Sequence, residues 1–126
     1  FCSNTCRRKR HIAKQRKIRE KTYGYSASSV DTGKVGAIGE SQVCCDLIRK
    51  GYTVFRSVSQ SASCDLIALK EKNLLRIEVK SSWRKEDGSL GIPTTRIDHS
   101  NFDILALVLK DEIKYVPSKY SINSYI

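Results

Sequence analysis

The segment that decides the fold is CDLIALKEKNLLRIEVKS, residues 64–81. Apolar and polar side chains alternate on both sides of a polar turn at residues 71–73. This pattern predicts a hairpin made of two strands, residues 64–70 and 74–81. In the second strand, three apolar positions share the face expected to lie in the core: Leu75, Ile77 and Val79.

The other face of this hairpin carries charged side chains. Glu78 and Lys80 emerge side by side on the second strand. Pairing Leu66 and Ala68 with the apolar side of that strand places Asp65 on the same face as Glu78, roughly opposite it. Two carboxylates in this arrangement repel each other and each titrates at a higher pH, unless a cation lies between them. A hard metal ion with oxygen ligands suits that position.

A third carboxylate, Glu40, lies on a helix expected over residues 32–50, with Gly51 as its C-terminal stop. The apolar positions of this helix recur at helical spacing: Val35, Ile38, Val43, Leu47 and Ile48. Glu40 shares a stripe with Gly36 and two of those residues, Val43 and Leu47, so it should point where they point. Gly36 and Gly39 would permit a close approach to the sheet. An acid on such a stripe is uncommon without a partner, and a metal ion would be one.

These residues resemble the motif of the PD-(D/E)XK nuclease superfamily. The resemblance runs through Gly36-Ala37-Ile38-Gly39-Glu40, then Asp65, then Glu78-Val79-Lys80. It implies that Asp65, Glu78, the carbonyl of Val79 and Glu40 hold Mg²⁺ or Mn²⁺. It also implies that Lys80 orients or activates the attacking water. One departure is Cys64, which stands where the superfamily name has proline.

The resemblance implies a divalent-metal-dependent endonuclease that hydrolyses phosphodiester bonds in DNA, of a homing, resolvase-like or restriction-like kind. Its catalytic residues would be Glu40, Asp65, Glu78 and Lys80. Residues 101–107 and 114–117 look like the branch that contains group I intron homing endonucleases and archaeal Holliday junction resolvases. A double-strand cut needs two sites, which a homodimer would supply. Two alternatives are a nucleic-acid-binding module that does not hydrolyse DNA and a noncatalytic scaffold with a nuclease-like fold.

The remaining pattern predicts a restriction-endonuclease-like fold of the α/β or α+β class, with a mixed central sheet flanked by helices. Further strands are expected at residues 52–56, 90–95, 103–109 and 113–116. A helical turn is expected near residues 98–101 and a last helical piece from Ser118. The polar loop after the first of these strands could contact phosphate or metal-bound water through Ser57, Ser59, Gln60 and Ser61.

Most of the positive charge lies in the first 30 residues. The chain carries a formal charge of +10; residues 1–30 hold nine basic side chains and one acid, hence +8, and residues 31–126 carry +2. A basic helix is expected at residues 6–21 and a linker at residues 22–29, ahead of a nuclease domain at residues 31–126. Such an arm suits DNA. The expected nucleic-acid contacts are Arg7, Arg8, Lys9, Arg10, Lys14, Arg16 and Lys17, together with Ser59 and Gln60.

Cys2 and Cys6 resemble the second half of a treble-clef zinc finger, in which a cysteine pair straddles the start of a helix. A structural zinc needs four ligands, and only His11 is nearby, poorly placed on the helix. Zn²⁺ is therefore expected only in a longer chain that carries the first ligand pair upstream. The absence of methionine, including at position 1, is typical of such a fragment.

The composition also predicts the setting of the protein. No stretch approaches the ~20 apolar residues of a membrane span, and no apolar signal segment opens the chain. Five cysteines form an odd, sparse set rather than a disulfide framework. We therefore expect a soluble, reduced, cytoplasmic protein that associates with DNA and not with a membrane. Small buried thiols are expected at Cys44, Cys45 and Cys64, a turn or capping residue at His99, and packing over the sheet end at Trp83.

Overall fold

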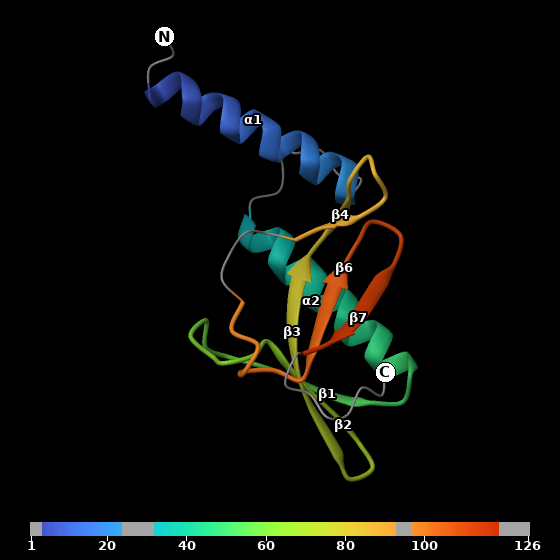
Figure 1. Ribbon diagram of the computed structural model, residues 1–126. Coiled ribbons are helices and arrows are strands. Elements are labelled where there is room, and N and C mark those ends of the chain that lie inside the picture. The colour runs from blue at the N-terminus through green and yellow to red at the C-terminus, as the bar shows by residue number, and fades with distance from the viewer. Residues whose placement is uncertain (1–3, 24–31, 93–96, 119–126) are drawn as a thin grey trace.

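Two helices and seven strands make up the part of the chain that this computed structural model describes, which is residues 4–23, 32–92 and 97–118 (Figure 1). The elements in chain order are α1 Asn4–Tyr23, α2 Thr32–Arg49, β1 Thr53–Arg56, β2 Leu66–Lys70, β3 Asn73–Ser81, β4 Trp83–Arg84, β5 Leu90–Gly91, β6 Ile104–Val108 and β7 Ile113–Pro117.

Five strands form one mixed sheet in the order β1-β2-β3-β6-β7. The central pair, β3 and β6, is parallel, and the other neighbours are antiparallel. The predicted hairpin is β2 and β3, whose register pairs Leu66 with Ile77 and Ala68 with Leu75. Because parallel strands need a crossover, the chain passes through the separate β4-β5 ribbon before it returns as β6. The predicted fold class is confirmed.

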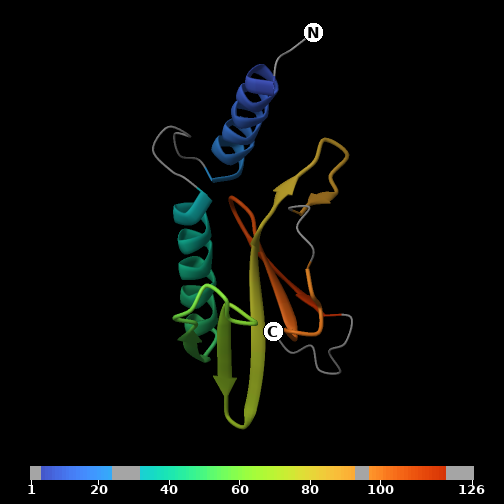
Figure 2. The same ribbon diagram turned by 90° about the vertical axis from the view of Figure 1, so that its left-hand side faces the viewer.

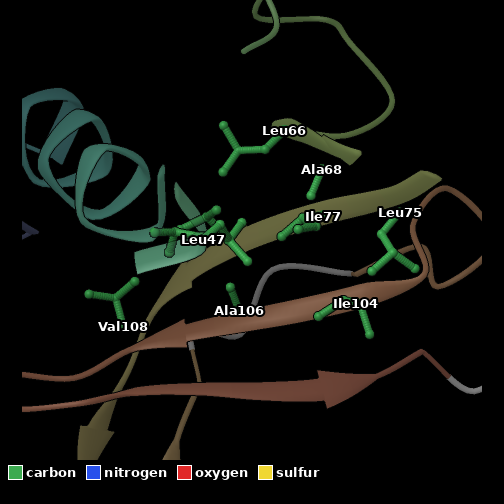
Figure 3. Packing of buried hydrophobic residues seen from close by; sticks show 10 residues of the cluster. Leu47, Leu66, Ala68, Leu75, Ile77, Ile104, Ala106 and Val108 are labelled. Atoms are coloured by element: carbon green, nitrogen blue, oxygen red, sulfur yellow. The ribbon is translucent and has the colours of Figure 1, made fainter. Parts of the chain in front are cut away.

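Helix α2 covers one face of the sheet (Figure 2). Its buried positions recur every fourth residue: Val35, Gly39, Val43 and Leu47. Figure 3 shows Leu47 packed among the side chains that the central strands send to this face. They are Leu66, Ala68, Leu75, Ile77, Val79, Ile104, Ala106 and Val108.

The predicted stripe of α2 was wrong in two positions. Ile48 is 59% exposed, and a Cβ at Gly36 would meet nothing within 4 Å, so neither residue lies against the sheet. The physical reason is that residues four apart are offset by only about 40° around a helix. The buried residues, which recur every fourth position from Val35, therefore form one narrow face. The true stripe therefore runs through Gly39, and Glu40 lies at its edge.

The opposite face of the sheet is also buried. Its cluster consists of Cys64, Phe102, Leu105, Leu107 and Leu109, with Ile67, Leu90 and Ile97 packed against it. No residue of α1 or α2 belongs to this cluster, so turns and β5 cover this face in the described part of the chain. Strand β6 is buried along its whole length because it has a core on both sides.

Several predicted elements need correction at their ends. The strand expected at residues 90–95 is Leu90–Gly91, and residues 93–96 lie outside the described residues. The expected helical turn near residues 98–101 is a single turn closed by a hydrogen bond from Asn101 N–H to Asp98 O, 3.2 Å. Helix α1 includes Thr22 and Tyr23, which were assigned to the linker. The rest of that linker and the piece after Ser118 lie outside the described residues.

Gly39 has room for a methyl group, which leads to a stability prediction. A Cβ there would lie 3.7 Å from Val108 Cγ2 and 3.8 Å from Val79 Cγ1, which is ordinary contact. Gly39→Ala should raise the free energy of unfolding by about 0.5–1 kcal/mol, because alanine loses less backbone entropy in a helix. Urea unfolding measures the change. Gly51→Ala is the control and should destabilise, since Gly51 ends α2 with a φ of 88°; a destabilising Gly39→Ala would contradict the packing described here.

Candidate active site

Glu78 and Lys80 lie on the face of β3 that turns away from α2. The two residues alternate with the buried Ile77 and Val79, as the strand period requires. Lys80 Nζ donates to Glu78 Oε1 at 2.5 Å, and the side chains are 27% and 18% exposed, respectively. The ammonium of Lys80 therefore supplies a cation next to the carboxylate of Glu78.

Asp65 is fixed by three hydrogen bonds just before β2 begins. Its N–H donates to the carbonyl of Ile77 at 3.1 Å, and its own carbonyl accepts the N–H of Ser57 at 3.0 Å. Its Oδ2 accepts the N–H of Val79 at 2.8 Å. Asp65 lies one position before Leu66, which pairs with Ile77, so it lies across the hairpin from Glu78. The structure thus brings Asp65, Glu78 and Lys80 to one face.

Glu40 has a different partner. Its Oε2 accepts a hydrogen bond from Arg56 Nη2 at 2.7 Å, which ties α2 to β1. Within the described part of the chain, no three His, Cys, Asp or Glu side chains are grouped so that they could hold a metal ion. The structure therefore does not bring Glu40 together with Asp65 and Glu78.

The sequence pattern did not indicate Arg56 as a site residue, although a signal for it exists. Alternation along β1 puts Arg56 on the same face as Val54, and Val54 packs against the core under α2. An arginine at the end of a strand face that packs against a helix can reach an acidic side chain on that helix. The hydrogen bond to Glu40 raises the pKa of Arg56 above its ordinary value, so this guanidinium stays charged.

A cleft of about 520 Å³ opens beside the β3 charges. Glu78 and Lys80 line it, together with the loop before Cys64 and the turn before β6. The other lining residues are Ser61, Ala62, Ser63, Ile97, Asp98, Asn101 and Phe102. Ser59 and Gln60 are exposed and do not line the cleft, although Ser59 Oγ lies 2.8 Å from Ser61 Oγ. A larger hollow of about 720 Å³, between α2 and the β6-β7 turn, holds none of the three charged residues.

A family model described as PD-(D/E)XK endonuclease matches residues 30–119. The chain belongs to this family. Its fold is similar to that of I-Ssp6803I, a bacterial homing endonuclease, with a TM-score of 0.60 and 20% sequence identity. The match covers 71% of this chain and 70% of that one. Among curated proteins, no sequence matches the chain.

A third ion pair supports the central strands of this PD-(D/E)XK endonuclease. Arg76 Nη2 donates to Asp103 Oδ1 at 3.0 Å, and Arg76 Nε donates to Asp103 Oδ2 at 3.2 Å. The backbones of the two residues are tied as well: Arg76 N–H donates to Asp103 Oδ2, and Asp103 N–H to the carbonyl of Arg76, both at 2.8 Å. Arg76 precedes Glu78 on the same face, so this clamp holds β3 and β6 next to the cleft.

The clamp leads to a prediction about pH. Hydrogen bonds from Arg76 hold the pKa of Asp103 below its ordinary value, and they outweigh the opposing effect of burial. An aspartate has a pKa of about 4 in the unfolded chain. Because the folded-state pKa of Asp103 is lower, its carboxylate stabilises the fold at pH values above about 4. This stabilisation is lost as the pH falls through the folded-state pKa. Asp103→Asn should therefore lower the free energy of unfolding by about 1–2 kcal/mol at neutral pH. The effect is no larger because Arg76 is partly exposed and solvent screens the ion pair.

Thermal melts of the wild type and Asp103→Asn between neutral and acidic pH would measure this. The gap between their stabilities should narrow below about pH 4, because the wild type loses the contribution that the variant lacks. Asp111→Asn, an exposed change in the β6-β7 turn, is the control and should leave the curve unchanged. A gap of constant size across the acidic range would contradict the role of the Asp103 carboxylate.

The expected nucleic-acid contacts on α1 are surface residues where their side chains are described. Arg7, Arg8, Lys9, Arg10, Lys14 and Lys17 are exposed, and the side chain of Arg16 is not described. Cys6 is half-buried, and Cys2 lies outside the described residues. None of the helices in the described part of the chain combines the length and apolar composition that a membrane crossing requires.

The remaining cysteines, His99 and Trp83 have structural surroundings. Cys64 is buried and Cys44 is half-buried, and burial raises the pKa of both thiols. The expectation of a buried thiol was wrong for Cys45, which is exposed and lines the hollow between α2 and the β6-β7 turn. The carbonyl of His99 accepts a hydrogen bond from Ser118 Oγ at 2.6 Å in a turn, as expected. The indole of Trp83 packs on Gly91, where a Cβ would lie 2.2 Å from Trp83 Cε2.

Proposed function

We propose that this family member is a divalent-metal-dependent endonuclease that hydrolyses phosphodiester bonds in DNA. One observation supports this most strongly: Asp65, Glu78 and Lys80 share one face of the β2-β3 hairpin, and the last two line a cleft. A hairpin with a merely solvated charged face would not need the Asp65 carboxylate fixed on the backbone of Val79.

The donor set suits a small hard cation. Asp65 and Glu78 offer carboxylate oxygens, and the carbonyl of Val79 points to the same strand edge as its N–H, which meets Asp65. Mg²⁺ is usually held by one or two carboxylates, with water and substrate phosphate as further ligands. These residues therefore fit Mg²⁺ or Mn²⁺, and we propose Glu40 as a supporting acid. When bound, the ion would lower the pKa of a water molecule and offset charge on the phosphate.

The side chains of the chain itself have distinct proposed roles. The Asp65 backbone bonds and the Val79 N–H fix that carboxylate, so it is preorganised and one oxygen remains for a cation. Glu78 holds the ammonium of Lys80 at the cleft. From there Lys80 can orient a water molecule and stabilise negative charge that develops on the phosphate oxygens.

The proposal is tested by incubating the full chain with linear duplex, a four-way junction and single-stranded DNA. Each substrate is offered with Mg²⁺, with Mn²⁺ and with a chelator. We expect cleavage of at least one DNA only when a divalent ion is present, and the preferred substrate distinguishes a site-specific nuclease from a resolvase. Binding to DNA without cleavage under any of these conditions would favour the alternative, a nucleic-acid-binding module with this fold.

We also propose that the protein acts on duplex DNA as a homodimer. One site cuts one strand, so a double-strand break requires a second copy. Light scattering of the protein alone and with its DNA measures the stoichiometry. A monomer that makes both cuts of a double-strand break in a single encounter would exclude this arrangement.

A further inference from the structure

Four basic side chains form a line along α1. Arg7, Arg10, Lys14 and Lys17 follow one another at intervals of three, four and three residues, the spacing of one helix face. At 3.6 residues per turn they fall within an arc of about 80° and extend about 15 Å along the axis. All four are exposed. We call this set the basic stripe.

The basic stripe has no counter-charge in the described structure. None of the ion pairs formed by the described side chains includes a residue of α1. Like charges three and four residues apart repel each other on a helix. No α1 residue belongs to either buried cluster, and even Ile12 is 42% exposed. A helix that is polar on all sides gains little from packing, so a bound polyanion would supply the missing stabilisation.

The position of α1 relates the basic stripe to the candidate active site. Both views of the molecule show α1 beyond the end of the sheet at which β3 terminates (Figures 1 and 2). Lys80 is the second-last residue of β3, so it lies toward this end. A straight, rigid ligand could therefore extend from the cleft toward α1.

We propose that the basic stripe binds successive phosphates along one strand of a DNA duplex while α1 lies in the major groove. A helix with its side chains is about 10–12 Å across, and the major groove is about 12 Å wide. Phosphates of one strand recur about every 3.4 Å along the duplex axis, and the groove runs obliquely to that axis, so a stripe of about 15 Å can meet a short run of successive phosphates. This inference rests on the proposed function, because it takes the DNA substrate of the nuclease as the ligand.

Two matched double variants of the full chain test the proposal. Arg10→Gln with Lys14→Gln removes two charges from the basic stripe, and Lys72→Gln with Lys110→Gln removes two exposed charges outside α1. Glutamine is nearly as good a helix former as arginine and lysine, so far-UV circular dichroism should be unchanged in both. Fluorescence anisotropy with a labelled mixed-sequence duplex, in a chelator and over a range of salt, measures binding without cleavage.

The stripe variant should make the slope of log K for DNA binding against log salt concentration shallower by about 1.8. It should also weaken binding by about 10- to 100-fold near 0.1 M salt. The control should change the slope by clearly less. Equal losses of DNA affinity in both variants would contradict a specific role for the basic stripe, because the total charge alone would then explain binding. If the two variants differed in affinity by the same factor on single-stranded DNA of that sequence, binding in the major groove of a duplex would be contradicted. A stripe-specific loss in a protein whose wild type cuts no DNA would support this inference while the proposed function fails.

Discussion

Replacing Asp65, Glu78 or Lys80 with alanine is expected to lower the DNA cleavage rate by about 100- to 1000-fold or more, the usual cost of removing a preorganised charged group. Asp65→Ala removes the carboxylate that the Val79 N–H fixes. Glu78→Ala removes the partner of Lys80, and Lys80→Ala removes the cation at the cleft. Binding of DNA in a chelator should change little, because these residues are assigned to the scissile phosphate rather than to affinity.

Three comparisons make this result specific. Asp65→Asn and Glu78→Gln keep the shape of the site and remove only charge, so they should lose activity to a similar degree. Glu86→Ala, an exposed change in the β4-β5 turn, should cut normally. Glu40→Ala should be impaired but retain residual cleavage, because Glu40 is proposed only as a supporting acid and its carboxylate is paired with Arg56. Near-normal turnover in Asp65→Ala, Glu78→Ala or Lys80→Ala would show that the site lies elsewhere.

Deleting residues 1–30 is expected to weaken DNA binding by about 100-fold or more at low salt. The deletion removes +8 of the +10 formal charge. The log-log salt slope should fall by about 0.9 for each phosphate that the shortened chain no longer neutralises. The nuclease fold should survive, because neither buried cluster contains a residue of α1 and the family match begins at residue 30.

Anisotropy over a range of salt, with circular dichroism and thermal melting as the fold control, measures this second effect. Cleavage by the truncated chain should persist at saturating DNA, since Asp65, Glu78 and Lys80 all lie in residues 31–126. Suppose that the truncated protein has the melting temperature of the wild type and an unchanged salt dependence of DNA affinity. The arm would then not contact DNA, and α1 would be a spacer or a partner-binding helix. Loss of the fold would instead contradict the division of the chain into an arm and a nuclease domain.

The sequence by itself determined the hairpin and its register. Alternation with a period of two puts Leu66, Ala68, Leu75 and Ile77 on one face, and the short polar turn selects which of them pair. A one-residue slip would move all of them to the wrong face. Asp65, Glu78 and Lys80 therefore meet for a local reason, within a segment of 18 residues, and the structure has this register.

Only the tertiary structure decided the partners of Glu40 and Arg76. Arg56 lies 16 residues after Glu40, and Asp103 lies 27 residues after Arg76. Each pair forms across two elements: α2 and β1 for the first, and β3 and the residue before β6 for the second. Periodicity places a side chain on a face of its own helix or strand, but it carries no information about the element that packs there. For this reason the sequence pattern did not reveal that Glu40 pairs with Arg56, and a metal shared by Glu40 and Asp65 stays a prediction.

The same distinction explains the cleft and the central strands. The apolar run in β6 indicated a strand, but its parallel pairing with β3 and its two buried faces depend on the crossover between them. That crossover brings Ile97 and Phe102 over the sheet face opposite α2, where they help to line the cleft beside Glu78 and Lys80. Local alternation could place the charged residues on a face, because it depends on neighbouring residues alone. Packing between distant segments decided which of those charges meet a cleft and which meet an ion-pair partner.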